Sequence, residues 1–146
     1  MGTMLVSFRI VSYQNRFRNG VVKIWEQCGL IRPQNDPMKD IETKMGFQPD
    51  LFLVAVLGDQ VVGSVMGGYE RHRGWLNYLA VAPEQQHKGY GRKLVEKAIA
   101  ELEKLGCPKV NLQVRDDNAA AAEFYKHLGF KEDLVRSFGK RLTNEK

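Results

Sequence analysis

The sequence lacks any apolar run long enough to cross a lipid bilayer. Its longest such run, Leu51–Gly58, has eight residues, whereas a membrane-spanning helix needs roughly 20. The first residues contain no basic segment followed by an apolar one, so we expect no signal peptide and no membrane partner. With 146 residues, the chain is expected to form a single domain over 1–146. Residues 1–4 are expected to be a disordered or cloning-derived extension.

Cysteine is also scarce. The chain has only Cys28 and Cys107, which is too few for a disulfide framework and favours a reducing, cytoplasmic location. Both are most simply interpreted as small buried apolar residues. The three histidines, His72, His87 and His127, do not lie at ligand spacing from either cysteine, so no metal site is predicted.

Internal repeats and low-complexity segments are absent, and the composition is that of an ordinary globular protein. The formal net charge of +5 is compatible with two interpretations: a surface for nucleic acid, or local positive charge for an anionic cofactor. The basic residues are dispersed along the chain rather than interleaved with aromatic residues in one block. We therefore expect no nucleic-acid partner.

Apolar periodicity predicts an α/β (α+β) domain in which helices cross over between the strands of a mixed central sheet. The expected order is β-α-α-β-β-β-α-β-α-β, and a further strand could follow at the C-terminal end. The domain would then have about six to seven strands and four helices. Strands are expected at 5–10, 51–57, 61–69, 74–82 and 109–114, with one or two more within 130–142. Helices are expected at 14–28, 37–47, 89–105 and 118–128.

The clearest chemical motif is the glycine-rich turn Gln86–Gly91, which directly precedes the predicted helix 89–105. A helix start leaves several backbone N–H groups without intrahelical partners, and the helix dipole adds positive potential there. Gly89 and Gly91 would permit close approach of a pyrophosphate, and Lys88 and Arg92 would add charge. Neither the P-loop pattern nor the dinucleotide-binding glycine pattern is present. Taken alone, the two glycines are weak evidence, and the alternative is a helix start that is merely rich in glycine.

Three separated motifs resemble those of the GNAT superfamily of N-acetyltransferases. Gln86-x-x-Gly89-x-Gly91 matches its pyrophosphate motif, and residues 78–83 look like its cofactor strand. The segment from Asn118 through Tyr125 to Phe130 is similar to the family's last helix. The resemblance covers most of the chain, from Phe8 to about Leu142. Within the superfamily, 28–37 and 65–69 resemble the small YpeA-type bacterial acetyltransferases.

The resemblance implies roles for individual residues toward acetyl-CoA, with no metal involved. The backbone N–H groups of His87–Arg92 would bind the pyrophosphate, and the main chain of Leu79 and Val81 would pair with the pantetheine arm. Asn118 would contact the cofactor. The implied cofactor-binding residues are Leu79, Ala80, Val81, Gln86, His87, Lys88, Gly89, Tyr90, Gly91, Arg92 and Asn118.

Tyr125 has two interpretations. Ala121, Phe124, Tyr125 and Leu128 share a helical face, and this periodicity alone favours a tyrosine packed in the core. The resemblance implies instead that Tyr125 is the general acid that protonates the departing thiolate. A positioned hydroxyl is suited to that task.

The general base and the acceptor pocket are less well defined by the sequence. Glu70, together with His72, could face the cleft as a base, although 70–74 also has the composition of a solvated turn. The proline-stiffened loop 30–37 is the predicted acceptor-side element. Arg32 and Asn35 are its candidate substrate-binding residues, unless the loop is a purely structural turn. Trp25 could line the same pocket or belong to the core.

The predicted function is transfer of an acetyl group from acetyl-CoA to a primary amine, by direct attack in a ternary complex. The acceptor amine would belong to a small molecule or to a protein or peptide. Two alternatives remain: the same fold acting on a longer acyl donor, and a non-catalytic acyl-CoA-binding or regulatory module. The chain is expected to be a monomer or a homodimer.

Overall fold

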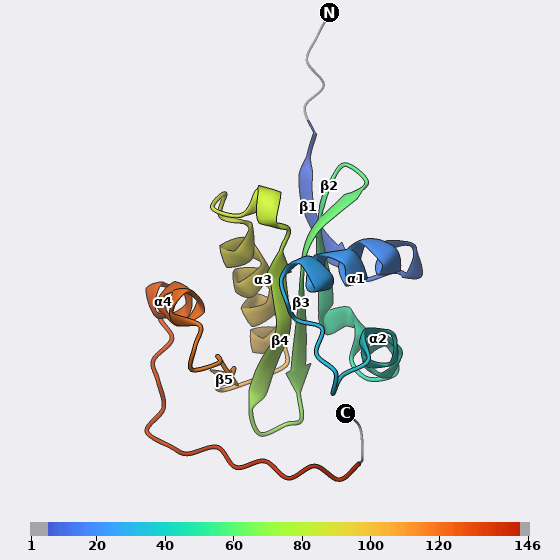
Figure 1. Ribbon diagram of the computed structural model, residues 1–146. Helices are drawn as coiled ribbons and strands as arrows, with labels where there is room; N and C mark the ends of the chain where they lie inside the picture. Colours follow the sequence, from blue (N-terminus) through green and yellow to red (C-terminus); the bar gives the residue numbers. More distant parts are fainter. Residues whose placement is uncertain (1–5, 144–146) are drawn as a thin grey trace, which may run out of the picture.

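A computed structural model describes residues 6–143 as a mixed sheet with helices on both faces (Figure 1). The expectation for residues 1–4 lies outside the described residues. The strands follow one another in space as they do in sequence: β1 (Phe8–Ser12), β2 (Phe52–Leu57), β3 (Gln60–Tyr69), β4 (Gly74–Val81) and β5 (Val110–Asn111). The α-helices are α1 (Arg18–Gln27), α2 (Pro37–Met45), α3 (Tyr90–Lys104) and α4 (Ala119–His127).

The sheet changes character at its last strand. The first four strands pair antiparallel, whereas β5 runs parallel to β4 and pairs with it only at Gly74 and Trp75. Beyond Trp75, the edge of β4 that faces β5 has no strand partner within residues 6–143. The two strands therefore separate along most of the length of β4.

The core consists of two layers, one on each face of the sheet. Strand β2 shows why: Phe52, Val54 and Val56 belong to the apolar cluster that contains residues of α1 and α2. Leu53 and Ala55 belong to the cluster that contains residues of α3. Side chains alternate between faces along a strand, so a strand that is apolar at every position must be covered on both faces. Figure 1 shows α1 and α2 on one side of the sheet and α3 and α4 on the other.

The predicted mixed sheet with four flanking helices is confirmed, but it has fewer strands than expected. The described residues form five strands rather than six to seven. The predicted strand 109–114 shortens to the two residues of β5, and 130–142 contains no strand. The alternating pattern of apolar residues was therefore a poor guide at this end of the chain, because a strand also needs a neighbour with which to exchange backbone hydrogen bonds.

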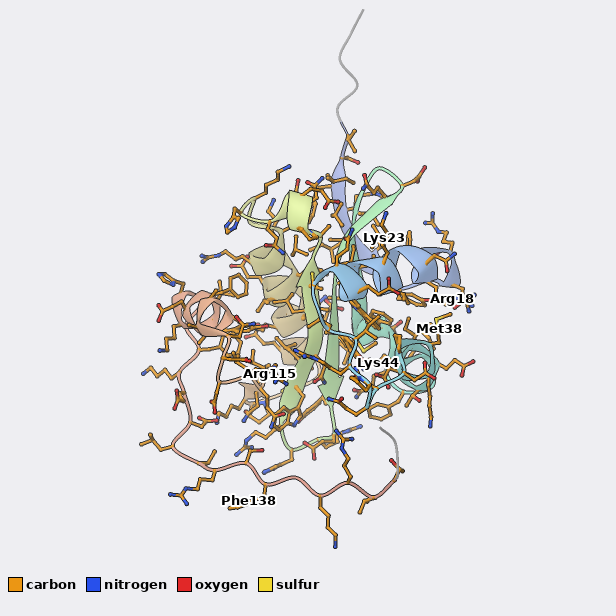
Figure 2. The ribbon with its side chains drawn as sticks, in the orientation of Figure 1. Arg18, Lys23, Met38, Lys44, Arg115 and Phe138 are labelled. Atoms are coloured by element: carbon orange, nitrogen blue, oxygen red, sulfur yellow. The ribbon has the colours of Figure 1, made fainter. Side chains whose placement is uncertain are left out.

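The segment after α4, residues 131–143, runs as an extended chain along the edge of the molecule (Figure 1). Its large apolar side chains point into solvent: Leu134 is 99% exposed and Phe138 90% exposed. Figure 2 shows Phe138 directed away from the body. The segment is linked to 109–113 through side chains, including an ion pair between Lys109 and Asp133 at 2.9 Å.

Helix boundaries agree with the sequence-based prediction to within two residues, except at the start of α1, which lies four residues later. The predicted helix 14–28 begins as a 3-10 turn at 15–17 that leads into α1. Asp36 caps α2 as predicted, its Oδ1 accepting from the backbone N–H of Met38 at 3.0 Å and of Lys39 at 3.3 Å. At α3, Gly89 is the N-cap rather than the first helical residue.

Candidate active site

The turn before α3 presents a row of backbone N–H groups. Among the hydrogen bonds of residues 6–143, none joins the N–H of any residue from His87 to Arg92 to a protein acceptor, and Lys93 is the first to donate, to Gly89 O at 3.1 Å. Positive φ angles at His87 (+66°) and Gly89 (+84°) shape the turn. The helix has no side-chain cap and no acidic residue in its first turn. The positive end of its dipole therefore remains available to an anion.

The side chains around this turn mostly contact the protein itself. Tyr90 stacks on Phe8, with ring centroids 4.4 Å apart, and the Arg92 Nε pairs with Glu96 at 3.2 Å. The Lys88 ammonium donates to Gln85 Oε1 at 3.0 Å. A Cβ at Gly91 would lie 3.3 Å from the Phe124 ring. The turn thus offers its backbone to a ligand, and it brings Gly91 close to α4.

The free edge of β4 continues from this turn. The backbone N–H of Ala82 donates to Val62 O on β3 at 2.9 Å. Because backbone groups alternate between the two edges of a strand, Val81 and Leu79 direct theirs toward the open side. The Val81 carbonyl accepts from Gln86 Nε2 at 3.0 Å, which ties the turn to the strand. The structure therefore places predicted residues 79–81 and 86–92 on one continuous surface.

Tyr125 and Asn118 lie together at a large cavity. This cavity, of about 1490 Å³, is bounded by β5, α4 and the segment after α4, and both residues line it. Asn118 also caps α4, its Oδ1 accepting from Ala121 N at 3.0 Å. Burial raises the pKa of Tyr125 to about 12, so its hydroxyl keeps its proton at neutral pH. The lining does not include residues 86–92.

A second pocket, of about 250 Å³, lies between α2 and the sheet. Its lining consists of residues on one face of α2, Phe47 just beyond that helix, one residue of β3 and two of β4. Asn77 lines both this pocket and the large cavity, so both spaces adjoin β4. The full lining is Asp40, Thr43, Lys44, Phe47, Met66, Asn77 and Tyr78.

Tyr78 organises the wall of this second pocket. Its φ of +54° coincides with an irregularity in the pairing of β3 with β4. The Tyr78 hydroxyl donates to Asp40 Oδ2 at 2.5 Å and accepts from Asn35 Nδ2 at 2.8 Å. Burial, followed by the bond to Asp40, raises the pKa of Tyr78 to about 12. The hydroxyl is therefore a fixed donor to the Asp40 carboxylate.

Lys44 supplies the positive charge of the pocket. It extends from α2 toward the sheet (Figure 2), where its ammonium donates to the carbonyl of Gly67 on β3. Burial lowers its pKa to about 8. Its charge is thus held in a partly desolvated position, where electrostatic interactions are stronger than in water.

Glu70, Arg32 and Trp25, which were predicted as the base or as acceptor-side residues, line neither cavity. Glu70 caps the exposed β3–β4 turn, its Oε1 accepting from the backbone N–H of Arg73 at 2.5 Å and of His72 at 3.0 Å. Those bonds, that from Arg73 foremost, lower its pKa, which disfavours a role as base. Arg32 is exposed and lines neither cavity. Trp25 is fully buried, so it is a core residue and not a pocket wall.

Sequence inspection missed the residues that form the second pocket. Asp40, Thr43, Lys44 and Phe47 follow helical spacing, three or four residues apart, so they share one face. That pattern was available in the sequence. The positive φ of Tyr78, a non-glycine residue within a strand, has no comparable signal. Asn35 was predicted on the acceptor side, and it reaches the pocket only through Tyr78.

These features fit an extended, phosphate-bearing ligand such as coenzyme A. The unpaired N–H groups of the turn would take the pyrophosphate, and the backbone N–H groups on the open edge of β4 would take an amide-containing arm. In residues 6–143, no group of three or more His, Cys, Asp or Glu could hold a metal ion. Within the same range, no helix is both long and apolar enough to span a membrane.

Comparisons with known proteins agree with this geometry. Residues 18–130 match the family described as Acetyltransferase (GNAT) family. An acetyltransferase of Sodalis glossinidius is 46% identical over 126 residues, which cover 86% of this chain and 89% of that protein.

Two solved structures with CoA share the fold. The aminoglycoside N-acetyltransferase AAC(6')-Iy in complex with CoA has a TM-score of 0.79 at 15% identity, covering 98% of this chain and 100% of that one. The PaiA N-acetyltransferase of Thermoplasma acidophilum in complex with coenzyme A has a TM-score of 0.69 at 19% identity, covering 89% and 93%. With its fold, its helix-start turn and its family match in agreement, the chain belongs to the GNAT family of acetyltransferases.

Proposed function

We propose that this acetyltransferase moves an acetyl group from acetyl-CoA to the nitrogen of a primary amine, within a ternary complex and in the cytoplasm. The observation that carries the proposal is the continuous surface formed by the turn 87–92 and the free edge of β4. Both parts offer backbone donors with no protein acceptor. A phosphate-bearing ligand with an amide-containing arm is complementary to such a surface.

Bound acetyl-CoA would supply the activated acetyl group at the thioester carbon. The chain's own part is to hold this co-substrate in register and to direct its acyl end toward Asn77, which lines both cavities. Holding the reactants in one orientation removes much of the entropic barrier of a two-substrate reaction.

Tyr125 is the proposed acid. As the amine nitrogen bonds to the acetyl carbon and the carbon–sulfur bond breaks, the Tyr125 hydroxyl gives its proton to the departing sulfur. The proton that the amine loses restores the phenol by way of solvent. Because the pKa of Tyr125 is about 12, the hydroxyl is protonated throughout the neutral range, as an acid must be.

The test is release of free thiol from acetyl-CoA with a panel of amines, compared between the parent chain and Tyr125→Phe. We expect Tyr125→Phe to bind CoA normally by calorimetry and to lose about 100-fold in kcat. Tyr13→Phe is the matched control, since Tyr13 is a buried tyrosine that lines neither cavity. CoA binding without turnover for any amine would favour the alternative, a non-catalytic acyl-CoA-binding module.

A further inference from the structure

One face of α2 presents two opposite charges to the second pocket. Asp40 and Lys44 lie four residues apart, the spacing at which helical side chains commonly form an ion pair. Here the carboxylate is held by the Tyr78 hydroxyl at 2.5 Å. The ammonium is held by the carbonyl of Gly67. Both side chains line the pocket, and no ion pair joins them among the described residues.

Each charge keeps capacity for a further partner. Asp40 Oδ1 receives no side-chain hydrogen bond from residues 6–143, and a carboxylate oxygen can accept more than one. The Lys44 ammonium has three donors, of which one is directed at Gly67. The remaining lining is largely apolar or neutral, including Phe47, Met66 and Thr43. The pocket therefore has a negative end and a positive end, joined by a small neutral space.

We infer that the acetyl acceptor is a small zwitterionic amine of the free amino acid class. Its ammonium would lie at Asp40 and its carboxylate at Lys44. This inference rests on the proposed function, because it assigns the acceptor for that reaction. The placement suits the chemistry: Tyr78 holds Asp40 on the β4 side of the pocket, and Asn77 opens on the space that Tyr125 lines.

The size and charge of the pocket argue against larger or polycationic acceptors. A volume of about 250 Å³ lies below the roughly 300–1,000 Å³ typical of sites for drug-sized ligands. A polyamine or a lysine-rich peptide would bring a second positive charge toward Lys44. Like charges at such a site repel, and that repulsion selects against the wrong partner.

The test compares free amino acids with two matched analogues of each: the carboxamide and the decarboxylated amine. Thiol release from acetyl-CoA gives kcat/KM for each member of a set. Calorimetry with CoA present gives the affinity for the amino acid independently of turnover. Because the three members of a set share a side chain, any difference in kcat/KM between them measures the contribution of the carboxylate.

For at least one amino acid we expect kcat/KM to exceed that of its carboxamide by about tenfold or more, the usual effect of a charge-assisted hydrogen bond. Lys44→Met should reduce this ratio to about one, because the carboxylate then loses its charged partner. Asp40→Asn should raise KM for both compounds. Lys23→Met on α1 and Glu42→Gln on α2 are exposed controls outside the pocket lining, and they should preserve the ratio.

Several results would overturn the inference. One is an equal or higher kcat/KM for the carboxamides or decarboxylated amines. Another is a preference for the carboxylate that persists in a folded Lys44→Met protein with normal CoA affinity. Turnover of peptide or protein amines alone would refute the zwitterion while leaving acetyl transfer intact. Absence of CoA binding would refute the proposed function, and calorimetry with amino acids alone would then still test the pocket.

Discussion

The indole of Trp25 stacks on the phenol of Tyr78, with ring centroids 3.9 Å apart and the planes inclined by 16°. Trp25 Nε1 donates to Ser64 Oγ at 2.9 Å, and Ser64 Oγ donates in turn to the Tyr78 carbonyl at 2.9 Å. Two core residues therefore hold Tyr78 in place: Trp25 packs on its ring, and Ser64 binds its backbone carbonyl. This support explains how a non-glycine residue with positive φ is held within a strand.

Trp25→Phe should lower the free energy of unfolding by about 1–2 kcal/mol, because it removes a buried hydrogen bond and part of a packed ring. It should also raise KM for the acceptor, since Tyr78 loses support. Chemical denaturation and steady-state kinetics measure the two effects. Ser64→Ala and the double variant complete a cycle. A strictly additive cycle would show that the bond between Trp25 and Ser64 contributes nothing.

Gly91→Val should weaken CoA binding by at least tenfold, because the new side chain enters the space between α3 and α4. Even a Cβ would lie 3.3 Å from the Phe124 ring and 3.6 Å from Val81 Cγ2, and a loss of about 1.4 kcal/mol corresponds to tenfold. Calorimetry with CoA measures the effect. Gly139→Val is the control, since nothing lies within 4 Å of that site. A folded Gly91→Val protein with unchanged CoA affinity would refute the assignment of this turn.

His87 separates backbone effects from side-chain effects in the same turn. Its φ is +66°, a conformation that glycine adopts without strain and that β-branched residues strongly resist. His87→Gly should therefore preserve CoA affinity, whereas His87→Val should reduce it and destabilise the fold by about 1–2 kcal/mol. Calorimetry and denaturation measure both quantities. Equal behaviour of the two variants would contradict a backbone role for this residue.

Lys44 should give the protein a distinctive dependence of stability on pH. Burial lowers its pKa from 10.5 to about 8, so between these values the unfolded chain binds more protons than the folded chain. Stability must then rise with pH across that window. The cost of burying the charge is fully present below pH 8 and is relieved as pH approaches 10.5.

Relative to Lys44→Met, the parent chain should gain about 1–2 kcal/mol in free energy of unfolding from about pH 8 to pH 10.5. This is less than the full pKa shift would give, because solvent partly screens the half-exposed ammonium. Denaturation of both proteins across this range measures the difference. Lys23→Met, which removes an exposed lysine, should show no such gain. A difference between parent and Lys44→Met that is flat or falls with pH would mean that Lys44 is not desolvated in the folded protein.

Local sequence signals were sufficient for much of the fold. The fully apolar strand β2 and the glycine-flanked helix α3 were recognisable because burial on both faces and helix capping leave clear residue patterns. The turn 86–91 was recognisable for a similar reason, since its chemistry depends on glycine and on backbone N–H groups. Family spacing then linked it to Tyr125, which lines the large cavity.

The rest depended on contacts between distant parts of the chain. Tyr78 forms hydrogen bonds with Asp40 and Asn35, which lie some 40 residues away in the sequence. No local sequence pattern predicts these contacts. The segment after α4 was predicted to supply one or two strands, yet it finds no backbone partner among the described residues. Strand pairing is decided by the neighbour as much as by the segment itself.

The separation of β4 from β5 leaves backbone groups of β4 without strand partners among the described residues when no ligand is bound. An uncovered strand edge is a template on which any other extended chain can form hydrogen bonds, and it is a common starting point for aggregation. A ligand that adds along β4 would occupy the same groups and stabilise the folded state by mass action. The supply of cofactor would then limit aggregation through this edge, as well as set how fast the protein works.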